Sequence, residues 1–179
     1  VGEKDMVYAL DSDPMEPSFG GIRNQLIVEL LYVTGIRLSE LIQLKETHVD
    51  LRNCVIKVLG KRNKERVIPF PENIVPSIRR YCRIRNQVVG KSHRDFLFVT
   101  LKGTPCYPML INRIVKSYLK AAAIDKKSPH VLRHTYATHL LDKGAEINAV
   151  KDLLGHSSLA ATQIYTHNSL EKLKKVFDQ

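Results

Sequence analysis

Residues 128–134 combine the start of a helix with side chains that suit a phosphate group. Ser128 is a good N-cap and Pro129 a good first helical residue, so His130 and Arg133 fall near the start of the helix. They are three residues apart and therefore share a face. The N-terminus of a helix also favours an anion. The pattern indicates phosphate binding, and a solvated basic helix end explains the fragment equally well.

The same segment also has the spacing of a helical metal pair, because His130 and His134 are four residues apart. A metal site needs a third ligand and usually a nearby carboxylate. Here Arg133 lies between the two histidines and adds positive charge where a cation would bind. We therefore predict no metal at this position.

Two further side chains near the end of the chain could take part in chemistry. His156 follows Gly155, which is expected to end a helix, so this histidine would be held on a tight turn. Tyr165 comes at the end of the next short helix, outside its apolar stripe. Taken alone, a tyrosine in such a place is more often a surface or partly buried packing residue.

Composition limits the kind of protein that these residues belong to. The 179 residues suffice for one compact domain, and 28 Lys and Arg against 18 Asp and Glu give a net charge of +10, which favours a nucleic-acid partner. Many soluble proteins are basic without binding nucleic acid. Cys54, Cys82 and Cys106 form no C-x-x-C pair, so we expect thiols in a reducing cytoplasm.

The elements that would position these side chains are mostly helical, with a small antiparallel sheet. Residues 1–19 are predicted as a linker and 20–179 as the domain. Helices are expected at 22–33, 72–89, 108–123, 129–143, 147–154, 158–165 and 170–177. Ser39 is expected to cap a further helix that ends at Leu44. Residues 55–59 and 66–70 predict a hairpin with a basic tip, and 96–100 an edge strand.

Five motifs in this order resemble the tyrosine recombinases, or phage-type integrases, and most closely their Xer-like bacterial branch. The similarity runs from about Asn24 to Phe177. The motifs are Thr34-Gly35-Ile36-Arg37-Leu38-Ser39-Glu40-Leu41, Gly60-Lys61-Arg62-Asn63-Lys64-Glu65-Arg66, His130-Val131-Leu132-Arg133-His134-Thr135-Tyr136-Ala137-Thr138, Leu154-Gly155-His156, and Tyr165. Any one of them would be weak, whereas the ordered set is highly specific.

The resemblance implies a role for each candidate. Arg37 and Arg133 would clamp the scissile phosphate, because a planar guanidinium contacts two oxygens of a phosphodiester that gathers charge. His130 and His156 would donate hydrogen bonds to that phosphate, and His130 would help to move the tyrosine proton. Tyr165 would attack the phosphorus and become covalently linked to it.

Two more residues take supporting roles by the same resemblance. Lys61 would reach into the minor groove and protonate the departing 5′ oxygen, with Lys64 and Arg62 as nearby alternatives. Glu40 would support the active-site arginine and histidine through hydrogen bonds, and an ordinary surface carboxylate is its alternative interpretation. The expected 3′-phosphotyrosyl link stores the bond energy, so no cofactor, metal or ATP is implied.

The resemblance also implies partners. Double-stranded DNA is the expected substrate, and an amino-terminal DNA-clamp domain is expected upstream of Val1. Leu170, Leu173, Val176 and Phe177 form an apolar stripe on a basic helix. We expect this helix to dock on a neighbouring protomer in a tetrameric synapse, the alternative being that it folds back on its own domain.

Two other functions share this fold: a DNA-binding regulator that has lost its chemistry, and a type IB topoisomerase. The complete set of candidate residues argues against the regulator. The sequence does not separate chromosome-dimer resolution from integration or excision of a mobile element. Exposed basic helices, including the segment with Arg79, Arg80, Arg83 and Arg85, are candidates for DNA contact.

Overall fold

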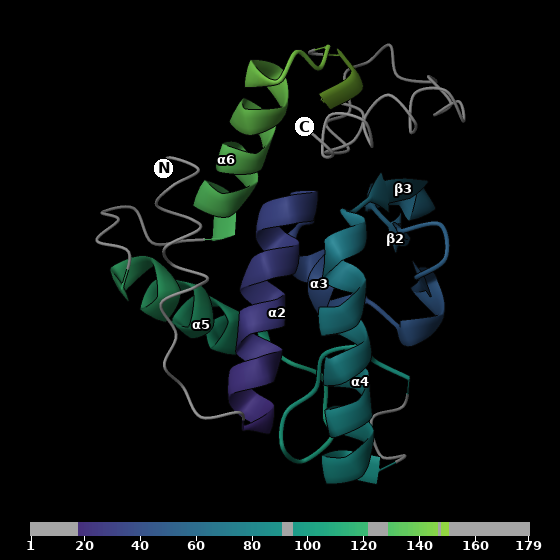
Figure 1. Ribbon diagram of the computed structural model, residues 1–179, viewed down its shortest axis with the longest axis vertical. Helices are drawn as coiled ribbons and strands as arrows, with labels where there is room; N and C mark the ends of the chain where they lie inside the picture. Colours follow the sequence, from purple (N-terminus) through teal and green to yellow (C-terminus); the bar gives the residue numbers. More distant parts are fainter. Residues whose placement is uncertain (1–17, 91–94, 122–128, 147, 151–179) are drawn as a thin grey trace.

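The computed structural model describes residues 18–90, 95–121, 129–146 and 148–150 (Figure 1). Within these residues five α-helices, three strands and three short 3₁₀ helices follow one another along the chain. None of the described helices has both the length and the apolar character that a membrane crossing requires.

Helix α2 (Phe19–Thr34) runs through the centre of the molecule, between α4, α5 and α6 (Figure 1). Ser18 starts it by accepting a hydrogen bond from the Gly21 amide at 3.0 Å. Gly35 ends it with a φ of 62°, a left-handed conformation that glycine adopts without strain. The predicted helix is confirmed, with one additional turn at its start. The turn at Gly35 redirects the chain toward Arg37.

Helix α3 (Leu38–Gln43) begins directly after that turn. The prediction that Ser39 caps it is wrong, because Arg37 occupies the N-cap position and Ser39 is an exposed residue inside the helix. The Glu40 carboxylate accepts the backbone N–H of Arg37 at 2.9 Å, as in a capping box. A side chain reaching back along the helix therefore replaces the expected serine cap.

The sheet contains β1 (Val49–Asp50), β2 (Val55–Leu59) and β3 (Glu65–Pro69) in the order β1-β2-β3, with both pairs antiparallel. Two 3₁₀ helices flank its strands, η1 (Glu46–His48) before β1 and η2 (Lys61–Asn63) at the hairpin tip. The predicted hairpin is confirmed, with β3 beginning and ending one residue earlier than expected.

The prediction that residues 96–100 form the edge strand is wrong, because the third strand is β1. Leu97, Phe98 and Val99 are all fully buried, so this segment is core on both sides and shows no alternation. The segment makes only isolated bridges, Phe96 with Lys45 and Val99 with Pro105, and three of its carbonyl groups accept hydrogen bonds from arginines. Arg85 donates to the carbonyls of residues 96 and 97, and Arg23 to that of Val99, each at 3.1 Å.

The remaining described helices agree with the predicted ones. The 3₁₀ helix η3 (Glu72–Ile74) leads into α4 (Val75–Val89), and α5 (Pro108–Ala121) and α6 (Pro129–Asp142) follow. Arg85 corrects the expectation of a basic surface on α4, because its side chain is completely buried while Arg79, Arg80 and Arg83 are exposed. Of the segment predicted as a helix at 147–154, only 148–150 are described.

Candidate active site

Arg37 and Glu40 lie at the start of α3, where the turn after α2 fixes the backbone. Besides accepting the Arg37 amide, Glu40 has its Oε2 3.8 Å from Nη1 of Arg37. The Arg37 side chain is 28% exposed, whereas that of Glu40 is 5% exposed. Glu40 is therefore a buried carboxylate that holds Arg37 at the surface, and the alternative of an ordinary surface carboxylate is wrong.

Arg66 of β3 is the principal partner of Glu40. Its Nη1 and Nη2 donate to the two carboxylate oxygens, the second at 2.9 Å, and its side chain is 9% exposed. Such a two-point contact fixes the carboxylate in orientation as well as in position. Arg66 stands in one of the motifs quoted from the sequence, yet sequence analysis gave it no role.

The strand pattern carries a signal that could have identified Arg66. Arg66, Ile68 and Phe70 alternate along the hairpin, and the last two are buried. A charged residue that continues a buried face requires a buried partner of opposite charge. The signal predicts that a partner exists, and only the fold identifies it as Glu40.

Arg133 lies one turn into α6 and is partly buried, and Arg37 and Arg66 are close enough to affect its charge. Burial and, after it, the charges of Arg37 and Arg66 lower the pKa of Arg133 to about 10, while Glu40 acts in the opposite direction. The guanidinium still carries its charge at neutral pH. The structure therefore brings Arg37, Glu40, Arg66 and Arg133 together from three separate parts of the chain, and we call these four residues the arginine cluster.

Helix α6 is held in place by its contacts with α2. The Tyr32 hydroxyl and Nδ1 of His139 form a hydrogen bond of 3.1 Å between the two helices, and the rings meet edge to face. His130 belongs to the first turn of α6, and the description there extends only to its backbone. Ser128, His156, Tyr165 and the helix predicted from Leu170 to Phe177 lie outside the described residues.

Lys61 lies on η2, at the tip of the hairpin between β2 and β3. The turn is closed by a hydrogen bond of 2.9 Å from the Gly60 amide to the Lys64 carbonyl. Arg62 has a φ of 61°, a left-handed conformation for a non-glycine residue. Lys61, Arg62 and Lys64 are all exposed on this one turn, so each stays a candidate for the proton donor.

Three other side chains that could act as nucleophiles are inactivated by burial. Desolvation raises the pKa of Cys82 to about 11 and that of Cys106 to about 11, and it raises the pKa of the Tyr81 hydroxyl far above its ordinary value. These groups stay protonated and unreactive at neutral pH. None of these three side chains is therefore a candidate for the nucleophile.

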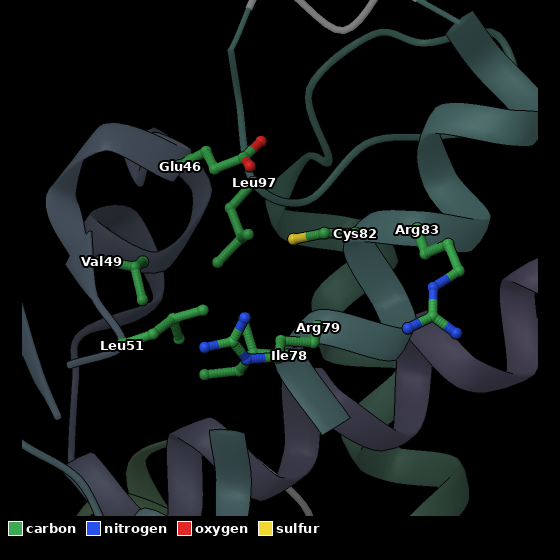
Figure 2. A pocket seen from close by; sticks show the side chains of 8 residues that line it. All are labelled: Glu46, Val49, Leu51, Ile78, Arg79, Cys82, Arg83 and Leu97. Atoms are coloured by element: carbon green, nitrogen blue, oxygen red, sulfur yellow. The ribbon is translucent and has the colours of Figure 1, made fainter. Parts of the chain in front are cut away.

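A pocket of about 460 Å³ lies between α4 and the segment that contains η1 and β1 (Figure 2). Figure 2 shows the side chains that line it: Glu46, Val49, Leu51, Ile78, Arg79, Cys82, Arg83 and Leu97. None of the predicted catalytic residues is among them, although Arg79 and Arg83 belong to the basic segment predicted as a candidate for DNA contact. The predicted catalytic or supporting residues Arg37, Glu40 and Arg133 lie in the arginine cluster instead.

Known proteins resemble this chain in sequence. The model of the phage integrase family matches residues 4–172. Tyrosine recombinase XerC of Chlorobaculum parvum is 41% identical over 169 residues, which are 90% of this chain and 50% of that protein. Tyrosine recombinase XerD of Staphylococcus saprophyticus is 39% identical over 181 residues, covering the whole of this chain and 61% of XerD. The chain thus spans about half to three fifths of these relatives.

Solved structures resemble it in fold. The XerA recombinase superposes with a TM-score of 0.78 at 32% identity, covering 100% of this chain and 65% of XerA. The XerH site-specific recombinase, solved with its palindromic difH substrate after cleavage, gives 0.77 at 27% identity over 98% of this chain and 50% of XerH. The predicted fold, mainly helical with a three-stranded antiparallel sheet, is confirmed. The chain therefore belongs to the phage integrase family, and in sequence and fold it is similar to the Xer tyrosine recombinases.

Proposed function

We propose that the chain is the catalytic part of a site-specific DNA recombinase, which cuts and rejoins DNA strands through a 3′-phosphotyrosyl intermediate. The arginine cluster is the observation that carries this proposal. It gathers three guanidinium groups around one carboxylate, and burial together with the neighbouring Arg37 and Arg66 lowers the pKa of Arg133. Like charges held together in a partly buried site are unfavourable in the free protein and favourable once an anion binds.

In the proposed reaction the phenolic oxygen of Tyr165 attacks the scissile phosphorus. A bond between that oxygen and phosphorus forms as the bond from phosphorus to the 5′ oxygen breaks, and the 5′ oxygen leaves with a proton from Lys61. Arg37 and Arg133 stabilise the charge on the non-bridging oxygens. Because one phosphodiester replaces another, religation by a 5′ hydroxyl needs no external energy source.

The two histidines complete the proposed site. His130 and His156 donate hydrogen bonds to the phosphate, and His130 takes up the tyrosine proton. His130 lies on the same helix as Arg133, at its N-terminal end, which favours an anion.

DNA is the proposed partner. The net charge of +10 favours a polyanion, and the similar XerH was solved on its DNA substrate. We also propose that the catalytic domain begins with the N-cap of α2 at Ser18, two residues before the predicted start at 20, and extends to 179, and that the residues before it are a linker. The helix from Leu170 to Phe177 docks on a neighbouring protomer in a tetrameric synapse. The protein acts in the cytoplasm.

Covalent capture tests the proposal directly. The protein is incubated at low salt with a library of nicked duplexes whose central sequence is randomised, and products are separated on a denaturing gel. A DNA adduct of the protein is expected, and Tyr165→Phe should abolish it. Tyr107→Phe, which alters an exposed tyrosine bonded to Arg113, is the matched control and should keep it.

The same captured complexes separate the alternative functions. An adduct that joins its strand to a second, heterologous duplex is expected of a recombinase, whereas rejoining only to the original strand would indicate a topoisomerase. Binding to the library without any adduct would make the catalytically silent DNA-binding regulator the better account.

A further inference from the structure

The ion pair between Arg66 and Glu40 joins two elements that the proposed chemistry uses separately. Glu40 belongs to α3, whose N-cap is Arg37, and Arg66 belongs to β3, the second strand of the hairpin that carries Lys61. Both side chains are almost completely buried, at 5% and 9% exposure. The pair therefore sets the distance between the two elements with little interference from solvent.

On the side of α3, one carboxylate determines where Arg37 lies. It accepts the Arg37 amide at 2.9 Å and lies 3.8 Å from the Arg37 guanidinium. The helix has only six residues, and the contact at its first turn adds to the burial of Leu41 and Ile42 in ordering it. A change in the orientation of Glu40 would move both the backbone and the charge of Arg37.

On the side of the hairpin, the pair lies at the base of the turn that carries Lys61. Arg66 is opposite Val58 in the strand register, close to the end of β2. A Cβ atom placed on Gly60 would be 3.7 Å from Nη1 of Arg66 and 3.8 Å from Oε2 of Glu40. Lys61 follows Gly60 directly, so its backbone leaves from a point adjacent to the ion pair.

Arg66 also affects how closely Glu40 pairs with Arg37. Because both carboxylate oxygens receive a donor from Arg66, the Arg37 guanidinium stays at 3.8 Å from Glu40 rather than in a close two-point contact. The ion pair with Arg66 therefore takes the two close contacts that this carboxylate makes with a guanidinium.

We propose that Arg66 is a positioning residue for strand cleavage, which uses Glu40 to hold the Arg37 clamp and the Lys61 hairpin in a fixed relation. The proposal rests on the function proposed above and adds a residue to it. Arg66 touches no reacting atom in this scheme, so its removal should weaken two separate contributions: phosphate clamping by Arg37 and proton delivery by Lys61.

The test compares two leaving groups. Nicked duplexes recovered by covalent capture are prepared with oxygen or with sulfur at the 5′-bridging position, and single-turnover cleavage is measured. A thiolate leaves without a proton, so the sulfur substrate does not need Lys61. Arg66→Met should slow cleavage about 100-fold with oxygen and only about tenfold with sulfur, since a misplacement of about 1 Å costs on that order.

The matched control is Lys57→Met, on the same hairpin. Lys57 pairs with Glu65 at 3.6 Å, and both side chains are more than half exposed, so this change should leave both rates as in the unaltered protein. If Arg66→Met does not fold by circular dichroism, Arg66→Lys replaces it, because its ammonium group keeps the charge and loses the two-point contact. A smaller loss on both substrates is then expected, again greater with oxygen than with sulfur.

Three results would overturn the inference. Arg66 variants that cut both substrates at the normal rate would show that the ion pair positions nothing. Equal losses on the two substrates would remove the connection to Lys61. If the unaltered protein itself forms no adduct, the proposed function fails and the inference with it, whereas an active protein with indifferent Arg66 variants refutes the inference alone.

Discussion

Two arginine–carboxylate pairs, Arg85 with Glu46 and Arg66 with Glu40, differ in what surrounds the guanidinium. Arg85 is completely buried, and besides Glu46 it donates to the Phe96 and Leu97 carbonyls and to the Asn86 side chain, so the groups around it are acceptors. Arg66 shares the Glu40 carboxylate with Arg37, and the Arg133 guanidinium is close enough to be affected by both arginines.

The difference distinguishes a structural arginine from a binding arginine. The acceptors around Arg85 compensate for its desolvation and tie an irregular core segment to α4. In the arginine cluster, positive charge exceeds negative charge by two among the four residues, and stability gains little from that excess. Such an excess is expected where the missing negative charge comes from a ligand.

Removing Arg133 should have the largest effect on the cleavage rate, and it should show most clearly that the arginine cluster serves binding rather than stability. We expect Arg133→Met to slow cleavage about 1,000-fold, the order found when a donor to a developing oxyanion is lost. The free energy of unfolding should not fall by more than about 0.5 kcal/mol, because a desolvated cation among like charges is removed. Single-turnover cleavage and denaturant unfolding of the same preparation measure both.

Arg85→Met should behave in the opposite way. The free energy of unfolding should fall by about 3 kcal/mol, since the buried carbonyls lose hydrogen bonds from a charged donor. The folded fraction should cleave at the normal rate. If Arg85→Met instead lowered cleavage without lowering stability, the division between structural and binding arginines would be wrong.

Binding of an anion should stabilise the arginine cluster by a smaller amount. Inorganic phosphate at ten times its dissociation constant should raise the free energy of unfolding by about 1.4 kcal/mol. Arg133→Met should abolish this gain. Arg79→Met, which removes an exposed arginine of α4, is the control that should keep it, and an equal loss in both variants would point to nonspecific charge.

The smallest effect concerns the thiols beside the structural arginines. Arg85 lowers the pKa of Cys82 and Arg23 that of Cys106, yet burial dominates and raises each pKa to about 11. The folded pKa exceeds the unfolded one, so the unfolded state loses its protons first and stability falls with rising pH. Between pH 7 and 9.5 each thiol should cost about 0.8 kcal/mol.

The measurement is denaturant unfolding at the two pH values, with a variant that carries Cys82→Ala and Cys106→Ala as the reference. The pH-dependent loss should be smaller in this variant than in the unaltered protein. An equal loss in both would mean that the thiols ionise as readily in the folded state as in the unfolded state.

Local patterns predicted the described helices and the hairpin, because apolar periodicity and the Gly35 turn act over a few residues. The sequence also supplied Arg37, Glu40 and Arg133 through motifs. The predictions failed where an unexpected side chain made the hydrogen bond to a backbone group. Residues 96–100 have the composition of a strand, but Arg85 and Arg23 donate hydrogen bonds to three of their carbonyl groups. Ser39 is a typical N-cap residue, but the side chain that bonds the backbone at this helix start is Glu40. The pairing of Glu40 with Arg66 depends on tertiary packing, which no local pattern shows.

The arginine cluster also has a consequence for the order in which the protein matures. Arg66 and Glu40 are separated by 26 residues, so α3 and the hairpin can meet soon after both are synthesised. Arg133 arrives much later, on a helix that must still pack against α2. A chain still emerging from the ribosome therefore holds an incomplete phosphate site. Under the proposed function, the capacity to cut DNA should therefore appear only once α6 has packed against α2.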